Sequence, residues 1–367
     1  MAGPNPLQLP IDHNNYYRRG GPVFVRDAGK SNAEPTAQRY LGDSSSYLVD
    51  FLREFHGVKI VWEHRYFGDS VPFPVNLTTP WEQFEYLTTL QALEDIPAFA
   101  QAFRHPHTRV GCSYAGARAV FSRAKHPETF HAAYASSATV EAENNGNMYF
   151  QQVYRGMVGY GYENCTQSLR QIVQHSLFFS PGAEYNTHAD FAGALATIYN
   201  KFQGIINKSF QTNCAGQNSS MPISCDLSQT RAPDPALISW AWTLCSEWGL
   251  GLGPAPEPYP IVSKYILSHD SRANLCNIQF PGAIDAGALP AQPEAAQLNQ
   301  ATGGRHVRPS NTFWTVGEFD PWRSRTPLTG TGTEHCYDLR VSSPSAHTAR
   351  MRFVDNLRTW LSEWRPM

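Results

Sequence analysis

The stretch of the chain most able to do chemistry surrounds a serine. Residues 109–116 are Arg-Val-Gly-Cys-Ser-Tyr-Ala-Gly, so Ser113 lies between Gly111 and Ala115. A serine nucleophile on a tight strand-to-helix turn needs small residues two positions before and after it, because the backbone folds closely there. Gly111 and Ala115 meet this need, and Gly116 relaxes the turn further. The pattern predicts a nucleophile elbow, although such a short string alone is common among proteins.

A helix beginning directly after Ser113 would point its free N–H groups and the positive end of its dipole at the serine. The N–H group of Tyr114 is therefore expected to be one donor to a negatively charged reaction intermediate. The second donor is expected from the loop after the first strand, near residues 27–30. This chemistry would be acyl transfer through an oxyanion.

A serine nucleophile also needs a base and a carboxylate that orients the base. Asp320 follows an apolar strand-like segment and precedes Pro321, which suits an orienting acid at the end of a strand. His335 stands 15 residues later, and the order Ser, Asp, His is typical of one class of hydrolases. The chain holds 13 histidines, so an ordinary solvated loop histidine is the alternative for His335.

The elements around these residues indicate a parallel sheet. Residues 21–25 and 58–62 are predicted strands, and residues 47–55 between them form a predicted helix, which together make a strand–helix–strand unit. Thr88 and Gln91 form a capping-box pattern. The helix after it is expected to bury Leu90, Leu93 and Phe103, with a kink at Pro97.

The pattern changes near residue 141, where helical periodicity replaces strands. The apolar residues with helical spacing are Leu169, Ile172, Val173 and Leu177, then Phe191, Leu195, Ile198, Phe202 and Ile205. A strand returns at residues 312–316, and the last helix carries Val354, Leu357, Leu361 and Trp364. We therefore predict an α/β-hydrolase fold. Its core is formed by residues 1–140 and 301–367, and residues 141–300 form an inserted α-helical cap.

Composition excludes several classes of function and indicates a compartment. The net charge is −2 without a Lys/Arg cluster, and no apolar run reaches the roughly 20 residues of a membrane helix, so neither nucleic acid nor membrane is expected as a partner. Residues 1–10 do not resemble a signal peptide. Seven cysteines nevertheless suit an oxidising compartment, with buried, reduced cysteines of a cytosolic enzyme as the alternative. Glycosylation sequons occur at Asn76, Asn164, Asn207 and Asn218. We expect a secreted, vacuolar or lysosomal protein whose signal peptide is absent from this chain.

Six segments together resemble one family of serine peptidases, that of prolyl carboxypeptidase, dipeptidyl peptidase II and the fungal prolyl endopeptidases. Residues 63–70 resemble the family's E-H-R-[YF]-[YF]-G-x-S signature, and residues 87–95 resemble its L-T-x-x-Q-A-L-x-D helix. The other matching segments are 111–116, 240–248, 319–322 and 335–339. The His335-Cys336 pair, in place of His-His, is similar to the fungal branch, and the chain looks like a shortened member of it.

The resemblance implies a peptidase that hydrolyses the bond on the C-terminal side of proline, with a proline-containing peptide as its partner and no cofactor or metal. Trp322 matches a residue that lines the proline pocket, and a core tryptophan is the alternative. Cys245 and Cys276 match a family disulfide. His64 and Arg65 follow a strand where sites gather, with an ion pair to Glu63 or Asp69 as the alternative. A homodimer remains open.

Two segments depart from the family pattern. Pro106 stands in the expected central strand before the elbow, where it cannot donate to the ladder. Residues 323–334 contain only Leu328 as an apolar residue, although the family has a strand before its histidine. Missing core strands would leave a catalytically impaired remnant of a hydrolase. An esterase or lipase on the same fold is the other alternative.

Overall fold

The computed structural model describes residues 16–42, 46–100, 105–167, 170, 231–249, 259, 275–327, 335–340 and 343–365. The two predicted helices with apolar residues 169–177 and 191–205 lie outside this part of the chain, as do Asn207 and Asn218. The described elements, in chain order, are β1 Val23–Asp27, α1 Ala33–Gly42, α2 Tyr47–Phe55, β2 Val58–Trp62, η1 Trp81–Phe84, α3 Thr89–Ala100, β3 His107–Cys112, α4 Tyr114–Lys125, β4 Phe130–Ser136, α5 Met148–Gly159, α8 Pro235–Thr243, η3 Leu244–Trp248, α10 Ala295–Thr302, η4 Gly304–His306, β5 Thr312–Thr315, η5 Arg323–Arg325, α11 Tyr337–Arg340 and α12 Pro344–Glu363.

Five parallel strands form one sheet in the order β2-β1-β3-β4-β5. The expectation of a missing central strand was wrong. Strand β3 begins at His107, directly after Pro106, and pairs with β1 and β4. Pro106 contributes its carbonyl oxygen, which accepts the Val23 N–H at 3.0 Å, so the missing proline N–H costs no ladder bond.

The strand–helix–strand prediction agrees closely with α2 and β2, which begin and end at the predicted residues. The predicted late strand is β5, four residues long. Within the described ranges no strand follows β5, and a short 3-10 helix, η5, stands in the segment before His335. The departure at residues 323–334 therefore corresponds to a sheet that ends at β5 in the described part of the chain.

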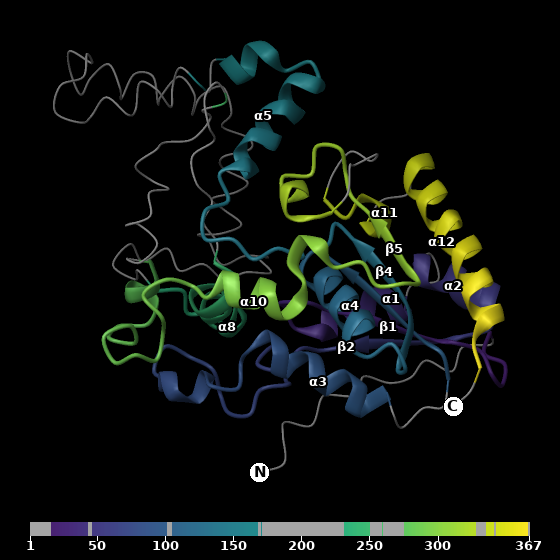
Figure 1. Ribbon diagram of the computed structural model, residues 1–367, viewed down its shortest axis with the longest axis horizontal. Coiled ribbons are helices and arrows are strands. Elements are labelled where there is room, and N and C mark those ends of the chain that lie inside the picture. Colours follow the sequence, from purple (N-terminus) through teal and green to yellow (C-terminus); the bar gives the residue numbers. More distant parts are fainter. Residues whose placement is uncertain are drawn as a thin grey trace.

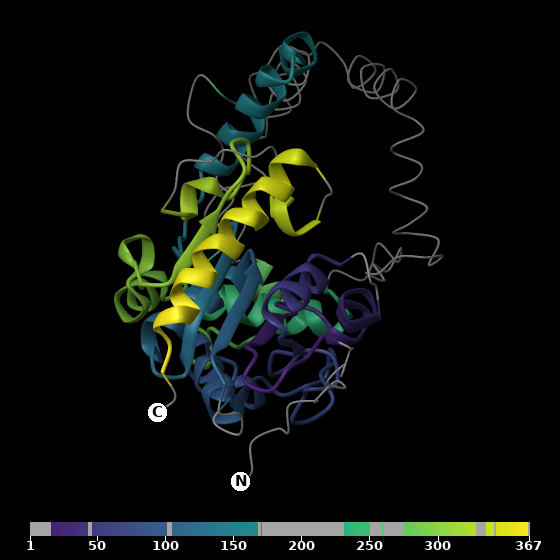
Figure 2. The same cartoon turned by 90° about the vertical axis from the view of Figure 1, so that its right-hand side faces the viewer.

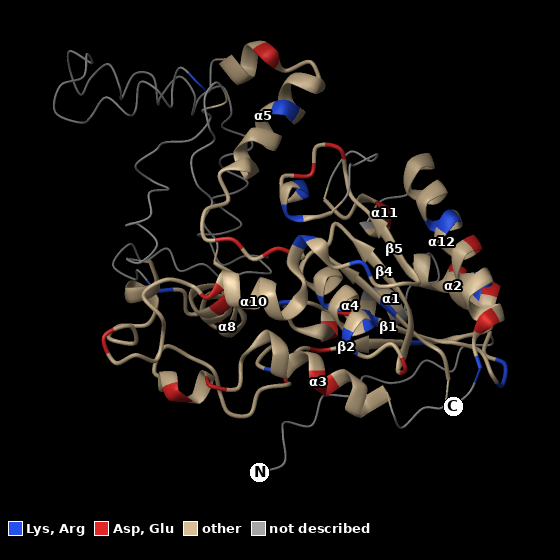
Figure 3. Ribbon diagram, in the orientation of Figure 1, with Lys and Arg blue, Asp and Glu red and all other residues tan. Residues whose placement is uncertain are grey.

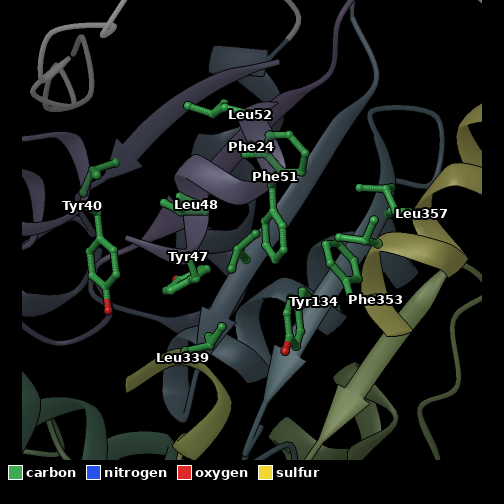
Figure 4. Packing of buried hydrophobic residues seen from close by; sticks show 14 of the residues in the cluster. Phe24, Tyr40, Tyr47, Leu48, Phe51, Leu52, Tyr134, Leu339, Phe353 and Leu357 are labelled. Atoms are coloured by element: carbon green, nitrogen blue, oxygen red, sulfur yellow. The ribbon is translucent and has the colours of Figure 1, made fainter. Parts of the chain in front are cut away.

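Helices cover both faces of the sheet, as a parallel sheet requires. One cluster packs α2 and α12 on the face that carries Phe24 and Tyr134, shown in Figure 4. Figures 1 and 2 show α12 running along this side of the sheet beside α2. The opposite face carries Val23 and Val25, which alternate with Phe24 along β1. Both faces of the strands are therefore buried.

Helix α3 begins where the capping box predicts. The Thr88 hydroxyl oxygen accepts the Gln91 N–H at 3.3 Å. Leu93 is buried as expected, but Leu90 is 37% exposed, which corrects the predicted apolar face. The buried side of α3 runs through Thr89, Leu93 and Ile96, and Leu90 is rotated about 100° from Thr89 around the helix axis. Phe103 lies outside the described residues.

The helices between β4 and β5 differ in how they lie against the core. Trp248 of η3 and Ala295 and Leu298 of α10 pack in one buried cluster with α4. Helix α5 extends away from the core in Figures 1 and 2. Figure 3 shows acidic and basic residues dispersed along the described ribbon rather than collected on one element. Among the described residues, no helix combines the length and the apolar character needed to cross a membrane.

A buried ion cluster joins β1, β3 and α4. The Asp27 carboxylate at the end of β1 contacts the guanidinium groups of Arg109 on β3, at 2.6 Å, and Arg118 on α4, at 3.3 Å. All three side chains are almost fully buried. Burial alone would raise the pKa of Asp27, but Arg118 and Arg109 outweigh it and hold the pKa below its usual value.

Replacing Asp27 with asparagine should destabilise the chain by about 3–5 kcal/mol, because two buried guanidinium groups lose their counter-charge. Urea unfolding of the wild type and Asp27→Asn measures this loss. Asp50→Asn is the matched control, since its ion pair with Arg53 is solvent-exposed and should contribute less than about 1 kcal/mol.

The stabilising effect of Asp27 should also depend on pH. The folded-state pKa is lowered, so the contribution is complete above the ordinary carboxyl pKa and is lost as the pH falls through the lowered value. The difference in unfolding free energy between wild type and Asp27→Asn should therefore shrink in acid. A difference that stays constant from neutral to strongly acidic pH would contradict this assignment.

Candidate functional site

Ser113 stands at the bend between β3 and α4 in a strained backbone conformation. Its φ of 59° and ψ of −127° are unusual for a residue with a side chain. Gly111 is necessary because a Cβ there would lie 2.0 Å from the Ala115 carbonyl oxygen. Gly116 lies against β4, where a Cβ would come within 2.9 Å of the Ser136 oxygen. The residues predicted to form the elbow therefore occupy a tight bend in which Ser113 is half-buried.

Strand β4 holds this bend in place through backbone hydrogen bonds. The Ser113 N–H donates to the Ser136 carbonyl at 2.9 Å, and the Ser137 N–H donates to Thr315 of β5 at 2.7 Å. Ser137 has a φ of 46°, so the chain leaves β4 in a second left-handed turn. The carboxyl ends of β3, β4 and β5 thus meet around Ser113.

The structure places His335 against Asp320. The His335 Nδ1 atom lies 2.9 and 2.8 Å from the two carboxylate oxygens. Because a carboxylate accepts, Nδ1 carries the proton and Nε2 is left unprotonated in the neutral ring. Asp320 is fully buried and also accepts the Trp322 N–H at 2.8 Å, whereas the His335 side chain is 20% exposed. The carboxylate therefore fixes both the tautomer and the plane of the imidazole.

A disulfide joins the residues next to Ser113 and His335. Cys112 and Cys336 form this bond with a Cα–Cα distance of 5.8 Å across 224 residues of sequence. Both sulfur atoms and a ring nitrogen of His335 lie within 4.8 Å of one another. No hydrogen bond joins the Ser113 hydroxyl to the His335 ring in the described part of the chain. Active-site hydrogen bonds are often long before substrate binds.

Sequence reasoning missed this disulfide. Both cysteines stood in segments already selected for their neighbours, Ser113 and His335, and this double adjacency was the available signal. Once Ser113 and His335 are expected to be close, the cysteines beside them must be close as well. Seven cysteines allow many pairings, however, and spacing alone does not choose among them.

Asp338 fixes the segment that carries His335. Its buried carboxylate accepts from the hydroxyl groups of Tyr134 at 2.5 Å, Ser136 at 2.5 Å and Thr315 at 2.6 Å. Burial, followed by the nearby Asp338 charge, raises the pKa of Tyr134 well above its usual value, so this phenol stays a donor. The start of α11 is thereby tied to β4 and β5.

The expected oxyanion donors lie beside the elbow. Tyr114 is the first residue of α4, so its N–H has no partner inside the helix. In the loop after β1, Ala28 donates to Trp62 and Gly29 donates to the Asp27 carboxylate. Lys30 makes no such backbone bond among the described residues. The loop is close to the elbow, because a Cβ on Gly29 would lie 3.5 Å from that of Ala115.

Trp322 belongs to an aromatic and charged group near Asp320. Its indole ring lies 4.7 Å from the Tyr149 ring and beneath the Arg325 guanidinium at 5.3 Å. Burial, and then the Asp320 charge, raises the pKa of Tyr149. Trp322 therefore lies next to the Asp320–His335 pair and is not fully buried.

His64 and Arg65 have structural partners. Arg65 makes a two-pronged ion pair with Asp95 on α3, at 2.7 and 2.5 Å, so the alternative of an ion pair holds for Arg65, but with a partner other than Glu63 or Asp69. No local pattern points to Asp95 as the partner, because it lies 30 residues away along the chain. His64 donates from Nδ1 to the Arg65 carbonyl and accepts from the Tyr114 hydroxyl at 3.1 Å. Burial and then Arg118 lower the pKa of His64 well below its usual value, so the ring is neutral.

The remaining predicted residues lie away from Ser113. Cys245 and Cys276 form a disulfide with a Cα–Cα distance of 5.9 Å. They border a largely apolar cavity of about 280 Å³, and none of Ser113, Asp320, His335 and Trp322 lines it. Asn76 and Asn164 are exposed, as glycosylation would require.

Comparison with known proteins gives the family. The profile of the family described as Serine carboxypeptidase S28 matches residues 12–239. A protein of Arthroderma benhamiae, described as a probable extracellular serine carboxypeptidase, is 23% identical over 438 residues, covering 86% of this chain and 58% of that protein. The lysosomal Pro-X carboxypeptidase of Mus musculus is 30% identical over 141 residues, covering 35% of this chain and 27% of its own length.

A solved proline iminopeptidase of Mycobacterium smegmatis aligns over 98% of this chain and 99% of its own, at 12% identity and a TM-score of 0.42. The fold assignment rests on the strand order and the bend at Ser113. The family match spans well over half of the 367 residues. The chain therefore has the α/β-hydrolase fold and belongs to the S28 serine carboxypeptidase family of serine peptidases.

Proposed function

We propose that this chain is a peptidase that cleaves the peptide bond on the C-terminal side of proline. Ser113 attacks the carbonyl carbon of that proline residue. His335 Nε2 takes the hydroxyl proton and later gives it to the leaving amine. Asp320 holds the proton on Nδ1 and stabilises the imidazolium that forms. Water then repeats the attack on the acyl-enzyme with the same base, which releases the acid product and free Ser113.

The observation that carries this proposal is the Asp320–His335 contact beside the strained bend at Ser113. The carboxylate is buried while the imidazole and the serine remain partly accessible, which is the distribution that a substrate needs. The backbone conformation of Ser113 is a strained state of the kind found at functional sites. A structural histidine would not explain why both features meet at the carboxyl ends of three strands.

The tetrahedral intermediate would be bound by two backbone N–H groups. Tyr114 supplies one from the start of α4, where the helix dipole adds to it. We assign the second to Lys30, because Ala28 and Gly29 already use theirs. This loop lies beside the elbow, since a Cβ on Gly29 would come within van der Waals distance of Ala115.

Preference for proline is supported by Trp322. A flat indole face suits a pyrrolidine ring, and the backbone N–H of Trp322 donates to Asp320, which ties this residue to the reacting groups. The name of the murine relative, a Pro-X carboxypeptidase, supports the same substrate class. We also propose a secreted, vacuolar or lysosomal location, which the two described disulfides and the exposed Asn76 and Asn164 support.

Ser113 should react rapidly with a fluorophosphonate probe, because only an activated serine does so. Mass spectrometry of the labelled peptide locates the adduct. Ser113→Ala should abolish labelling, whereas Ser345→Ala, on the exposed first turn of α12, should label as the wild type does. A folded, monodisperse sample that resists labelling would refute the proposed activity.

Asp320→Asn should lower kcat by about 10⁴-fold, because the amide would favour the wrong tautomer of His335. KM for a proline-containing peptide should change much less. Asp355→Asn, a surface acid paired with Arg358, is the control and should leave kcat unchanged. A loss of less than tenfold for Asp320→Asn would remove this residue from the proposed role.

Substrate comparison tests the proline assignment separately. A peptide with proline before the cleaved bond should be hydrolysed faster than one with alanine there and faster than a short acyl ester. Trp322→Ala should raise KM for the proline peptide by about fivefold and affect the alanine peptide little, because an aromatic contact contributes about 1 kcal/mol. Faster turnover of the ester than of either peptide would instead favour an esterase.

A further inference from the structure

We propose that the Cys112–Cys336 disulfide positions His335 against Ser113, so that peptidase activity requires this cysteine pair to be oxidised. The inference rests on the proposed function and adds to it a dependence on redox state. Cys112 directly precedes the serine, and Cys336 directly follows the histidine. One covalent bond therefore spans the gap between the two reacting groups.

Asp320 alone does not set the distance from His335 to Ser113. The Asp320 carboxylate fixes one edge of the His335 imidazole. Asp320 belongs to the loop after β5 and not to the elbow. In the described ranges the ring and the Ser113 hydroxyl share no hydrogen bond. The disulfide, by contrast, joins the elbow strand β3 to the His335 segment with a Cα–Cα distance of 5.8 Å.

The backbone of Cys336 shows that the bond holds a conformation the chain would not choose freely. Its φ is 57°, a left-handed value that costs roughly 1–3 kcal/mol for a residue with a side chain. Besides the disulfide, the Cys336 N–H donates to the Ser137 hydroxyl at 2.8 Å and the Cys336 carbonyl accepts from the Leu339 N–H at 3.1 Å. Asp338 holds the residues after Cys336, so the S–S bond is the only covalent cross-link that joins this left-handed residue and the neighbouring His335 to the elbow in the described part of the chain.

The exposure of the two residues defines the route of reduction. Cys112 is partly exposed, whereas Cys336 is fully buried. A thiolate of a small dithiol would attack the Cys112 sulfur and expel the Cys336 thiolate, giving a mixed disulfide. The second thiolate of the reagent then attacks its own sulfur in that bond and releases Cys112. The reagent leaves as a cyclic disulfide after giving two electrons, and each cysteine sulfur takes up one proton.

The chain contains a matched control in the Cys245–Cys276 disulfide. This bond lies at the cavity described above, whose lining includes neither Ser113 nor His335. It closes a short span of 31 residues between η3 and the segment before α10. Its reduction should therefore leave the distance between Ser113 and His335 unchanged.

Graded treatment of the full chain with dithiothreitol tests the inference. Differential alkylation and mass spectrometry give the reduced fraction of each disulfide, while fluorophosphonate labelling and peptide turnover report the site. Labelling and kcat should fall about 10- to 100-fold in step with reduction of Cys112–Cys336, since a displacement of about 1 Å can cost 10²-fold. KM should change less than about twofold, since the substrate pocket is not displaced. The near-ultraviolet circular dichroism should persist, and reoxidation should restore activity.

Two double variants complete the test. Cys112→Ala/Cys336→Ala should label slowly and be insensitive to dithiothreitol, whereas Cys245→Ala/Cys276→Ala should label as the wild type does and retain the sensitivity. Full-speed labelling of chains whose Cys112 and Cys336 are both alkylated would overturn the inference. Loss of circular dichroism in step with labelling would also overturn it, because the bond would then stabilise the fold rather than position His335. Absence of labelling in the oxidised wild type would instead refute the proposed function itself.

Discussion

The buried carboxylate of Asp27 links three segments that surround Ser113. Its carboxylate contacts Arg109 on the strand before the elbow and Arg118 on the helix after it. It also accepts the N–H of Gly29 in the loop that faces the elbow. The two guanidinium groups keep the buried Asp27 carboxylate ionised. Its ion pairs and its hydrogen bond therefore hold the three segments together. The position of Ser113 follows from this arrangement.

Backbone strain is concentrated around the same place. Ser113, Ser137 and Cys336 all have left-handed φ values, and they come from three segments that are distant in sequence. Hydrogen bonds and a disulfide connect these segments to each other: Ser113 to Ser136, Cys336 to Ser137, and Cys112 to Cys336. Each strained residue is thus held by its neighbours. Strain of this kind persists only where the surroundings determine the conformation strongly.

Local patterns predicted much of this structure, because local forces decide those parts. A short apolar run located β2, the segment between two such runs located α2, and the small residues around Ser113 located the elbow. Contacts between distant segments were beyond such patterns. Asp95 as the partner of Arg65, and the pairing of Cys112 with Cys336, depend on how strands and loops meet in space. Strand β3 forms despite Pro106 because the ladder begins one residue later.

Glu247 has a consequence for the order in which the chain folds. This residue comes from the segment between β4 and β5, yet its carboxylate receives the N–H and the hydroxyl of Thr89 at the start of α3, each at 2.8 Å. During synthesis, α3 is therefore made long before the group that completes its first turn has left the ribosome. The Thr89 N–H and hydroxyl group can bind this carboxylate only after a residue 158 positions downstream has been made. A chain that lacks Glu247 would accordingly leave the Thr89 N–H and hydroxyl group without this carboxylate partner.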